Sequence, residues 1–235
     1  MKSQNLDVLS RIVDLDKIEA TKKSINEANG LPNECYLSDE YFKIEREKVF
    51  FNNWIVVGVS SSVPEVGDAK PFNLMGIPLL ILRDKNNKIR VFHNVCSHRG
   101  MILVKEECKL KNTIRCPYHS WSYNFNGELI ATPHVGGMNI HETEGFIKSK
   151  SNLKEISTHV WMDLIFINVN KNKKDFEQSI DPLEKQWSKF ISKEDQKLIR
   201  HARDFGYFNM EVKSNWKLAI ENYCESYHLP WVHPE

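Results

Sequence analysis

The sequence predicts an α+β protein built around a small antiparallel β domain. Between residues 54 and 150, short runs of β-forming residues alternate with turns, as in antiparallel sandwiches and barrels. Asn126-Gly127 lies between two of these runs and favours a two-residue hairpin, because both residues tolerate a positive φ. Helical patterns precede and follow this region.

The N-terminal region predicts an arm followed by a helix. Residues 1–37 carry mixed charges and a loose helical pattern that breaks at a Gly-Leu-Pro sequence. Ser38 stands where an N-cap would, and Asp39 and Glu40 follow in the first turn, where the positive helix end favours acidic side chains. We therefore expect a helix over residues 39–52.

The remaining elements follow from hydrophobic periodicity. Expected strands cover residues 54–59, 79–83, 89–93, 121–125, 128–131, 160–169 and 207–213. A second turn is expected over residues 84–88, and an amphipathic helix over residues 175–191. Trp216 to Tyr227 fit a helix that must end by Pro230, and the last five residues form a tail with no element of their own.

Composition and charge exclude several classes of partner. Lys and Arg total 32 against 31 Asp and Glu, so the net charge gives no reason to expect nucleic acid or an anionic membrane. The longest apolar stretch, residues 77–82, is far shorter than the ~20 residues of a membrane span. The first residues lack the apolar run of a secretory signal, which predicts a cytoplasmic chain with reduced thiols. Spaced Cys and His residues in such a chain indicate metal rather than disulfides.

Two segments of the β domain each carry one cysteine and one histidine: Cys96-Ser-His98-Arg-Gly and Cys116-Pro-Tyr-His119-Ser-Trp. A tetrahedral zinc ion accepts two cysteines and two histidines, but zinc sites commonly pair like ligands at short spacing. One thiolate and one imidazole per loop instead suit a two-iron centre, with sulfur ligands on one iron and two histidines on the other. Zinc and unligated side chains are the alternatives.

A second group of metal-binding residue types lies near the C-terminus. Glu225 and His228 are three residues apart, which predicts that both lie on one helical face, and His233 can fold back toward His228 beyond Pro230. Two histidines with a carboxylate and open positions suit ferrous iron that binds O₂ and substrate side by side. Taken alone, such a histidine pair is more often coincidence or core packing.

Both segments resemble the alpha subunit of Rieske non-haem iron aromatic-ring-hydroxylating oxygenases. The matching text is C-S-H-R-G and C-P-Y-H-S-W-S-Y with the Asn-Gly hairpin, followed by N-W-K…E-N…E-x-x-H-x₄-H. The resemblance implies that Cys96 and Cys116 bind the inner iron of a [2Fe-2S] cluster, and that His98 and His119 bind the outer iron.

The second motif implies that His228 and His233 bind a catalytic mononuclear Fe(II). Glu225 stands where the family places a bridging acid, which joins an iron-binding histidine to a Rieske histidine of the adjacent subunit and passes electrons across a trimer interface. That acid is usually Asp. A Glu at this position resembles the Rieske monooxygenases that act on quaternary ammonium compounds such as carnitine. The family's third iron ligand, a carboxylate, comes from further along the catalytic domain, and Glu235 is too close to replace it.

The resemblance implies an arm over residues 1–37, a Rieske [2Fe-2S] domain over residues 38–155, and over residues 156–235 the incomplete start of a helix-grip-like catalytic domain. It implies a mono- or dioxygenase in which NAD(P)H acts through a reductase or ferredoxin and O₂ is the co-substrate. The substrate would be a small aromatic or quaternary ammonium compound. A homotrimer or other alpha3-type oligomer is expected, with the isolated chain inactive. The alternative is a Rieske electron-transfer module without oxygenase activity, which a natural stop codon at this point would favour.

Overall fold

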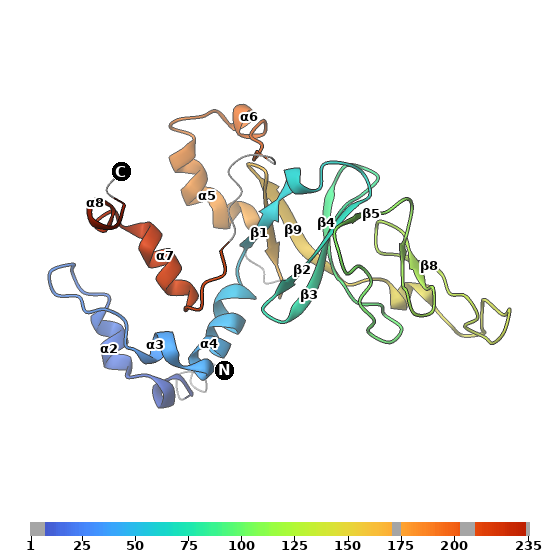
Figure 1. Ribbon diagram of the computed structural model, residues 1–235, viewed down its shortest axis with the longest axis horizontal. Helices are drawn as coiled ribbons and strands as arrows, with labels where there is room; N and C mark the ends of the chain where they lie inside the picture. Colours follow the sequence, from blue (N-terminus) through green and yellow to red (C-terminus); the bar gives the residue numbers. More distant parts are fainter. Residues whose placement is uncertain (1–7, 171–174, 203–209, 234–235) are drawn as a thin grey trace. The chain divides into compact units, whose positions relative to one another are not determined.

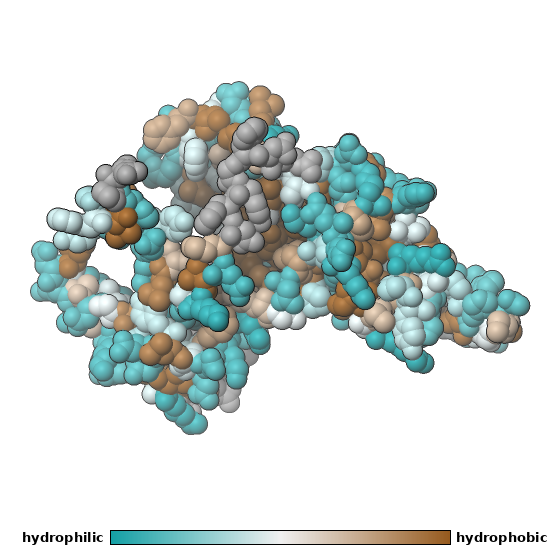
Figure 2. Space-filling model, viewed as in Figure 1, coloured by the Kyte–Doolittle hydropathy of each residue, from teal (hydrophilic) through white to brown (hydrophobic). Residues whose placement is uncertain are grey.

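The computed structural model describes residues 8–170, 175–202 and 210–233 of the chain. It divides into two compact units, which are residues 50–207 and, as the second unit, residues 1–49 with 208–235. None of the helices in these described ranges is long and apolar enough to cross a membrane. Hydrophilic and hydrophobic residues alternate over the visible surface (Figure 2).

The unit of residues 50–207 contains two antiparallel sheets (Figure 1). The larger sheet has the strand order β1-β10-β9-β4-β3-β2-β5 and the smaller one the order β6-β7-β8. The strands are β1 (Ile55–Val59), β2 (Asp68–Leu74), β3 (Ile77–Arg83), β4 (Ile89–His93), β5 (Cys108–Lys109), β6 (Ile114–Arg115), β7 (Ser122–Tyr123), β8 (Leu129–Ala131), β9 (Glu155–Trp161) and β10 (Leu164–Asn168). Helices α5 (Phe176–Trp187) and α6 (Lys193–Gln196) follow. The predicted α+β class with an antiparallel β domain is confirmed.

Strand β3 lies inside the larger sheet, between β4 and β2, and is buried on both faces. Its side chains alternate between two hydrophobic clusters: Leu80 and Leu82 belong to one, Leu79 and Ile81 to the other. All four side chains are at most 2% exposed. Burial on both faces explains why this strand is an uninterrupted apolar run in the sequence.

Residues 160–169, predicted as one strand, contain a tight turn. Strands β9 and β10 meet at Met162 and Asp163, whose φ angles are 49° and 67°. The buried Asp163 carboxylate accepts hydrogen bonds from the backbone N–H groups of Ser61 (3.0 Å) and His201 (2.9 Å), which holds the turn. The prediction joined the two strands because Met-Asp carries no glycine signal for positive φ.

The sheet also extends beyond the predicted β region. Strand β9 pairs with β4 and with β10, so pairing continues across residue 155, where the sequence predicts a domain boundary. That boundary stays a prediction about the family's domains. Strand β2 was not predicted, because Pro71 and alternating charged residues interrupt its apolar pattern.

The second unit is helical. Residues 8–12 are helical, and α2 (Leu15–Ala20), α3 (Glu34–Leu37), α4 (Asp39–Glu45), the π-helical segment η1 (Arg46–Phe50), α7 (Trp216–Cys224) and α8 (Leu229–Val232) follow. The predicted N-cap of α4 is confirmed, because the Ser38 hydroxyl accepts from the Tyr41 N–H (3.2 Å). Of the strand predicted over residues 207–213, residues 207–209 lie outside the described part and 210–213 form no strand.

A hairpin at Asn126-Gly127 is confirmed, but the predicted two-residue turn is wrong: the Asn124 N–H donates to the Glu128 carbonyl, so the loop is longer, and only Gly127 of the pair has a positive φ. The glycine is required by space as well as by φ. Gly127 has a φ of 83°, and a Cβ there would lie 2.6 Å from Cε1 of the fully buried Phe92 ring. Gly76 has a similar φ of 93°, but a Cβ there would meet nothing within 4 Å. Gly127→Ala should therefore lower the free energy of unfolding by about 1–3 kcal/mol more than Gly76→Ala, measured by urea denaturation. Equal losses would show that Phe92 yields without cost.

His159 of β9 should make stability depend on pH. Its ring stacks on Phe176 at a centroid distance of 3.8 Å, and burial lowers its pKa from the ordinary value although Glu177 and Asp175 oppose the shift. The unfolded chain therefore takes up the proton first, and the free energy of unfolding falls as the pH drops below about 6.5. In His159→Gln, the difference in unfolding free energy between pH 7.5 and a pH below about 6.5 should be smaller than in the wild type. An unchanged difference would contradict this assignment.

Candidate metal centres

Cys96 and Cys116 each begin a tight loop with the same pair of backbone hydrogen bonds. The Cys96 N–H donates to the carbonyl five residues on (2.8 Å), and its carbonyl accepts from the N–H four residues on (2.9 Å). Cys116 makes the same two bonds at 2.8 and 3.1 Å. The fourth residue after each cysteine has a positive φ, which is 71° at Gly100 and 60° at Ser120. The two loops thus have the same backbone hydrogen-bond pattern and hold their cysteines at the same position in it.

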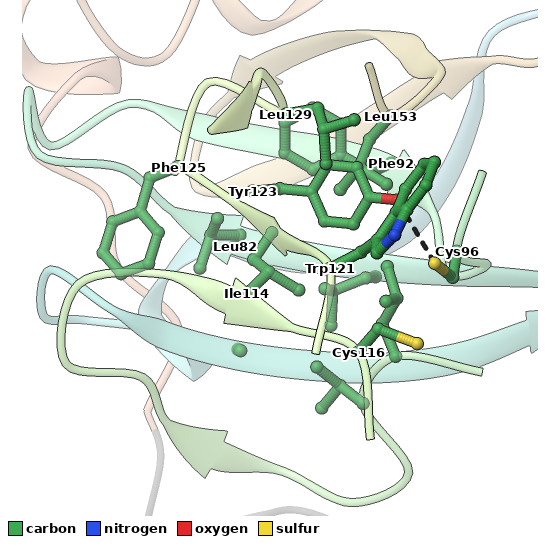
Figure 3. Close-up of a cluster of buried hydrophobic side chains, with 14 residues drawn as sticks. Leu82, Phe92, Cys96, Ile114, Cys116, Trp121, Tyr123, Phe125, Leu129 and Leu153 are labelled. Carbon is green, nitrogen blue, oxygen red and sulfur yellow. Dashed lines mark hydrogen bonds between the residues drawn. The ribbon is translucent and has the colours of Figure 1, made fainter. Parts of the chain in front are cut away.

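Both thiols lie at the same end of one hydrophobic cluster (Figure 3). The Cys96 sulfur is 3.3 Å from the Tyr123 hydroxyl, which also accepts from the Ser97 N–H at 3.1 Å. Burial raises the pKa of the Cys96 thiol, and the neighbouring Cys116 thiol adds to the increase although the Tyr123 hydrogen bond opposes it. An anionic sulfur is unfavourable there unless a metal ion neutralises it.

The two imidazoles lie closer to the surface than the thiols. His98 is exposed and His119 is half-buried, with ring centroids 4.9 Å apart. Trp121 stacks on His98 at 4.6 Å, and Tyr118 lies against His119 at 3.7 Å. Burial lowers the pKa of His98, and the nearby His119 and Arg99 lower it further, which favours the neutral ring that binds metal.

One atom of this group is buried without a partner. Nδ1 of His119 is inaccessible to solvent and has no hydrogen-bond partner in the described part of the chain. Such an atom is rare in folded proteins and is explained by a missing ion or water. The donor set therefore has a nitrogen that fits a metal bond.

The four side chains can be compared with the ligand sets of a zinc site and of a [2Fe-2S] cluster. Within the described ranges, no three His, Cys, Asp or Glu side chains gather as ligands of a single ion. A structural zinc site would bring four ligands together. A [2Fe-2S] cluster takes two protein ligands on each iron, and its sulfides complete the coordination. The four side chains suit that cluster.

Tyr123 contacts Cys96 and Trp121 stacks on His98, but neither residue was predicted to have a role, although both lie in the C-P-Y-H-S-W-S-Y text. Their spacing after Cys116 was the available signal.

The imidazole edge opens into a hollow of about 490 Å³. It is lined by His98, Arg115, Tyr118, His119, Ser120, Trp121, Pro133, His134 and Val135. Cys35, Cys108 and Cys224 are free thiols away from both loops in the chain.

The second predicted group also comes together. Nδ1 of His228 lies 2.5 Å from Oε1 of Glu225, and the rings of His228 and His233 are 5.8 Å apart. The hydrogen bond to His228 lowers the pKa of Glu225, so the carboxylate stays charged. A carboxylate on one imidazole nitrogen orients the ring and leaves Nε2 for a metal ion.

The helical placement predicted for this group is wrong. Helix α7 ends at Cys224, and Glu225 is extended with φ −132° and ψ 156°. The Glu225 carboxylate then accepts from the backbone N–H groups of Tyr227 and His228, which turns the chain and competes with the helix. Pro230 is the second residue of α8, where no N–H is needed, so it begins a helix rather than ending one.

Comparison with known proteins places both segments. Residues 53–144 match the Rieske [2Fe-2S] domain, and residues 199–235 match the ring hydroxylating alpha subunit catalytic domain. The carnitine monooxygenase oxygenase subunit of Acinetobacter pittii is 30% identical over 203 residues, covering 86% of this chain and 52% of the relative. The glycine betaine monooxygenase oxygenase subunit of Pseudomonas aeruginosa is 27% identical over 238 residues, covering 98% and 52%.

The fold agrees with these matches. The crystal structure of a quaternary ammonium Rieske monooxygenase in complex with gamma-butyrobetaine has a TM-score of 0.75 and 29% identity, covering 86% of this chain and 56% of that one. The chain spans about half the length of the curated relatives it matches. The two matched segments, their order along the chain and this fold show that it belongs to the Rieske oxygenase alpha-subunit family.

Proposed function

We propose that this chain is the N-terminal part of the oxygenase subunit of a Rieske non-haem iron oxygenase, with a [2Fe-2S] cluster held by Cys96, His98, Cys116 and His119. The observation that carries the proposal is the buried, unpartnered Nδ1 of His119 beside the His98 ring, at the mouth of two loops whose thiols are buried.

The chain's own residues would set the cluster's properties. When bound, the cluster stores and passes on one electron at a higher potential than a four-cysteine cluster, because neutral imidazole replaces anionic thiolate. The thiols keep the sulfur side out of water, and the exposed edge of His98 offers a route for an electron from a reductase or ferredoxin that draws on NAD(P)H. The Tyr123 hydroxyl, by donating to the Cys96 sulfur, would raise the potential further.

We assign the mononuclear Fe(II) to His228 and His233, where bound iron supplies the O₂ chemistry for hydroxylation. The Glu225 carboxylate orients His228 and is proposed as the bridge to the Rieske histidines of an adjacent subunit in a homotrimer or related oligomer. We propose a quaternary ammonium substrate, because Glu225 replaces the usual Asp and the relatives above are named for carnitine and glycine betaine.

Replacing His119 by Cys tests ligation of the outer iron. The wild-type protein should be brown, with about two irons and two sulfides per chain, and His119→Cys should lower its reduction potential by on the order of 100 mV. Protein-film voltammetry and reduced-state EPR measure the shift. His134→Cys is the matched control, since His134 lines the same hollow but its Nδ1 already accepts from the Asn139 N–H at 2.8 Å. An unchanged or raised potential in His119→Cys would remove His119 from the ligand set.

Replacing Glu225 by Gln tests the bridge in the complete oxygenase. Both metal sites should remain filled, while reoxidation of the reduced cluster in a single turnover slows about 10-fold or more, because the neutral amide holds His228 less firmly and carries no charge. Visible absorption follows the reoxidation, and metal analysis checks occupancy. Glu225→Asp restores the family's usual acid and should retain coupling. Wild-type reoxidation in Glu225→Gln would rule out the bridging role.

A further inference from the structure

We infer that the buried ion pair of Glu45 and Lys217 positions the segment that carries Glu225, His228 and His233. Glu45 and Lys217 would be positioning residues for the second metal centre, contributed by α4 and α7. The inference rests on the iron site proposed above.

The ammonium group of Lys217 is surrounded by other side chains of the same chain. Its Nζ lies 2.7 and 2.8 Å from the two carboxylate oxygens of Glu45, and both side chains are only 9% exposed. Trp216 Nε1 donates to the same carboxylate at 3.1 Å. The rings of Tyr36, Tyr41 and Trp216 lie 5.2–5.5 Å from Nζ, within the range of cation–π attraction. Contacts from several directions therefore fix the geometry of the ion pair.

Further polar contacts hold α7 to the same region. The Asn215 side chain caps the helix by accepting from the Lys217 N–H (3.1 Å), and its amide donates to the Tyr36 carbonyl (3.0 Å). One turn later, the Tyr36 hydroxyl donates to Glu221 at 2.7 Å. Burial, followed by the contact with Glu221, raises the pKa of Tyr36 to about 12, so the phenol remains a donor. The helix is thus attached at two successive turns.

Apolar packing contributes less to holding this helix. Leu218, Ile220 and Tyr223 of α7 are 47%, 51% and 90% exposed. Because α7 ends at Cys224, directly before Glu225, a shift of the helix would displace the carboxylate and the imidazoles that follow. The Asn-Trp-Lys residues of the family motif therefore act, in this chain, as the attachment of the metal-binding segment.

The test uses the complete oxygenase with its cluster reconstituted and Fe(II) as the probe. Glu45→Gln and Lys217→Met should each weaken Fe(II) binding at the second centre about 10-fold or more, as loss of ligand-orienting contacts does in other metal sites. Amide hydrogen exchange at Tyr227 and His228 should accelerate. The cluster spectrum should not change. Glu19→Gln removes an exposed Glu–Lys pair of the same helical unit and should leave Fe(II) affinity at the wild-type value.

A double variant separates positioning from stability. Glu45→Leu with Lys217→Met removes both buried charges and should recover much of the thermal stability that the single variants lose, because no charge is left unpaired. Fe(II) affinity should stay low, since the directional contacts are gone. Recovery of affinity together with stability, or wild-type affinity in both single variants, would overturn the positioning role while leaving the proposed iron site intact. If His228→Ala leaves Fe(II) uptake at the wild-type value, both the proposed iron site and the positioning role would be overturned.

Discussion

The rest of the candidate cluster site depends on one constraint: two thiols are buried at the same end of a hydrophobic cluster while the neighbouring imidazoles reach the surface. Matched backbone hydrogen bonds in the two loops produce this arrangement, because each cysteine begins its loop and a residue with positive φ turns the chain back. Burial penalises a free thiolate, and a buried imidazole nitrogen without a partner is also unfavourable. Positive metal ions relieve both penalties, so the same packing that excludes water favours a bound cluster.

Sequence reasoning selected the candidate ligand residues more easily than it predicted the backbone around them. Cysteine and histidine carry their chemistry in their identity, so Cys96, His98, Cys116 and His119 could be selected before any fold was known. The Asn-Gly hairpin and the Ser38 cap were predicted for the same reason: the residue types have a direct local cause. The Met162-Asp163 turn was not predictable, because its support comes from Ser61 and His201, which are distant in the sequence.

The C-terminal group shows the same limit in another form. The spacing of Glu225 and His228 correctly suggested that they meet, but a helix was the wrong reason. A carboxylate that accepts from nearby backbone N–H groups can replace helical hydrogen bonds over one turn, and residue spacing alone does not distinguish the two. The extended Glu225 directly follows the last residue of α7, so its carboxylate contacts His228 from the end of that helix.

The two centres differ in how the chain builds them. The loops of the cluster site and the sheets that carry them lie within residues 50–207, so their geometry comes from one unit. The candidate residues of the second centre are close in sequence, but the helix that precedes them contacts distant residues, since Tyr36 and Glu45 contact Glu221 and Lys217. Residues 8–37 of the predicted N-terminal arm thus belong to a compact helical unit. A buried charge pair is a costly way to gain stability alone. Its directional geometry is better suited to keeping a helix end, and the metal ligands beyond it, in one place.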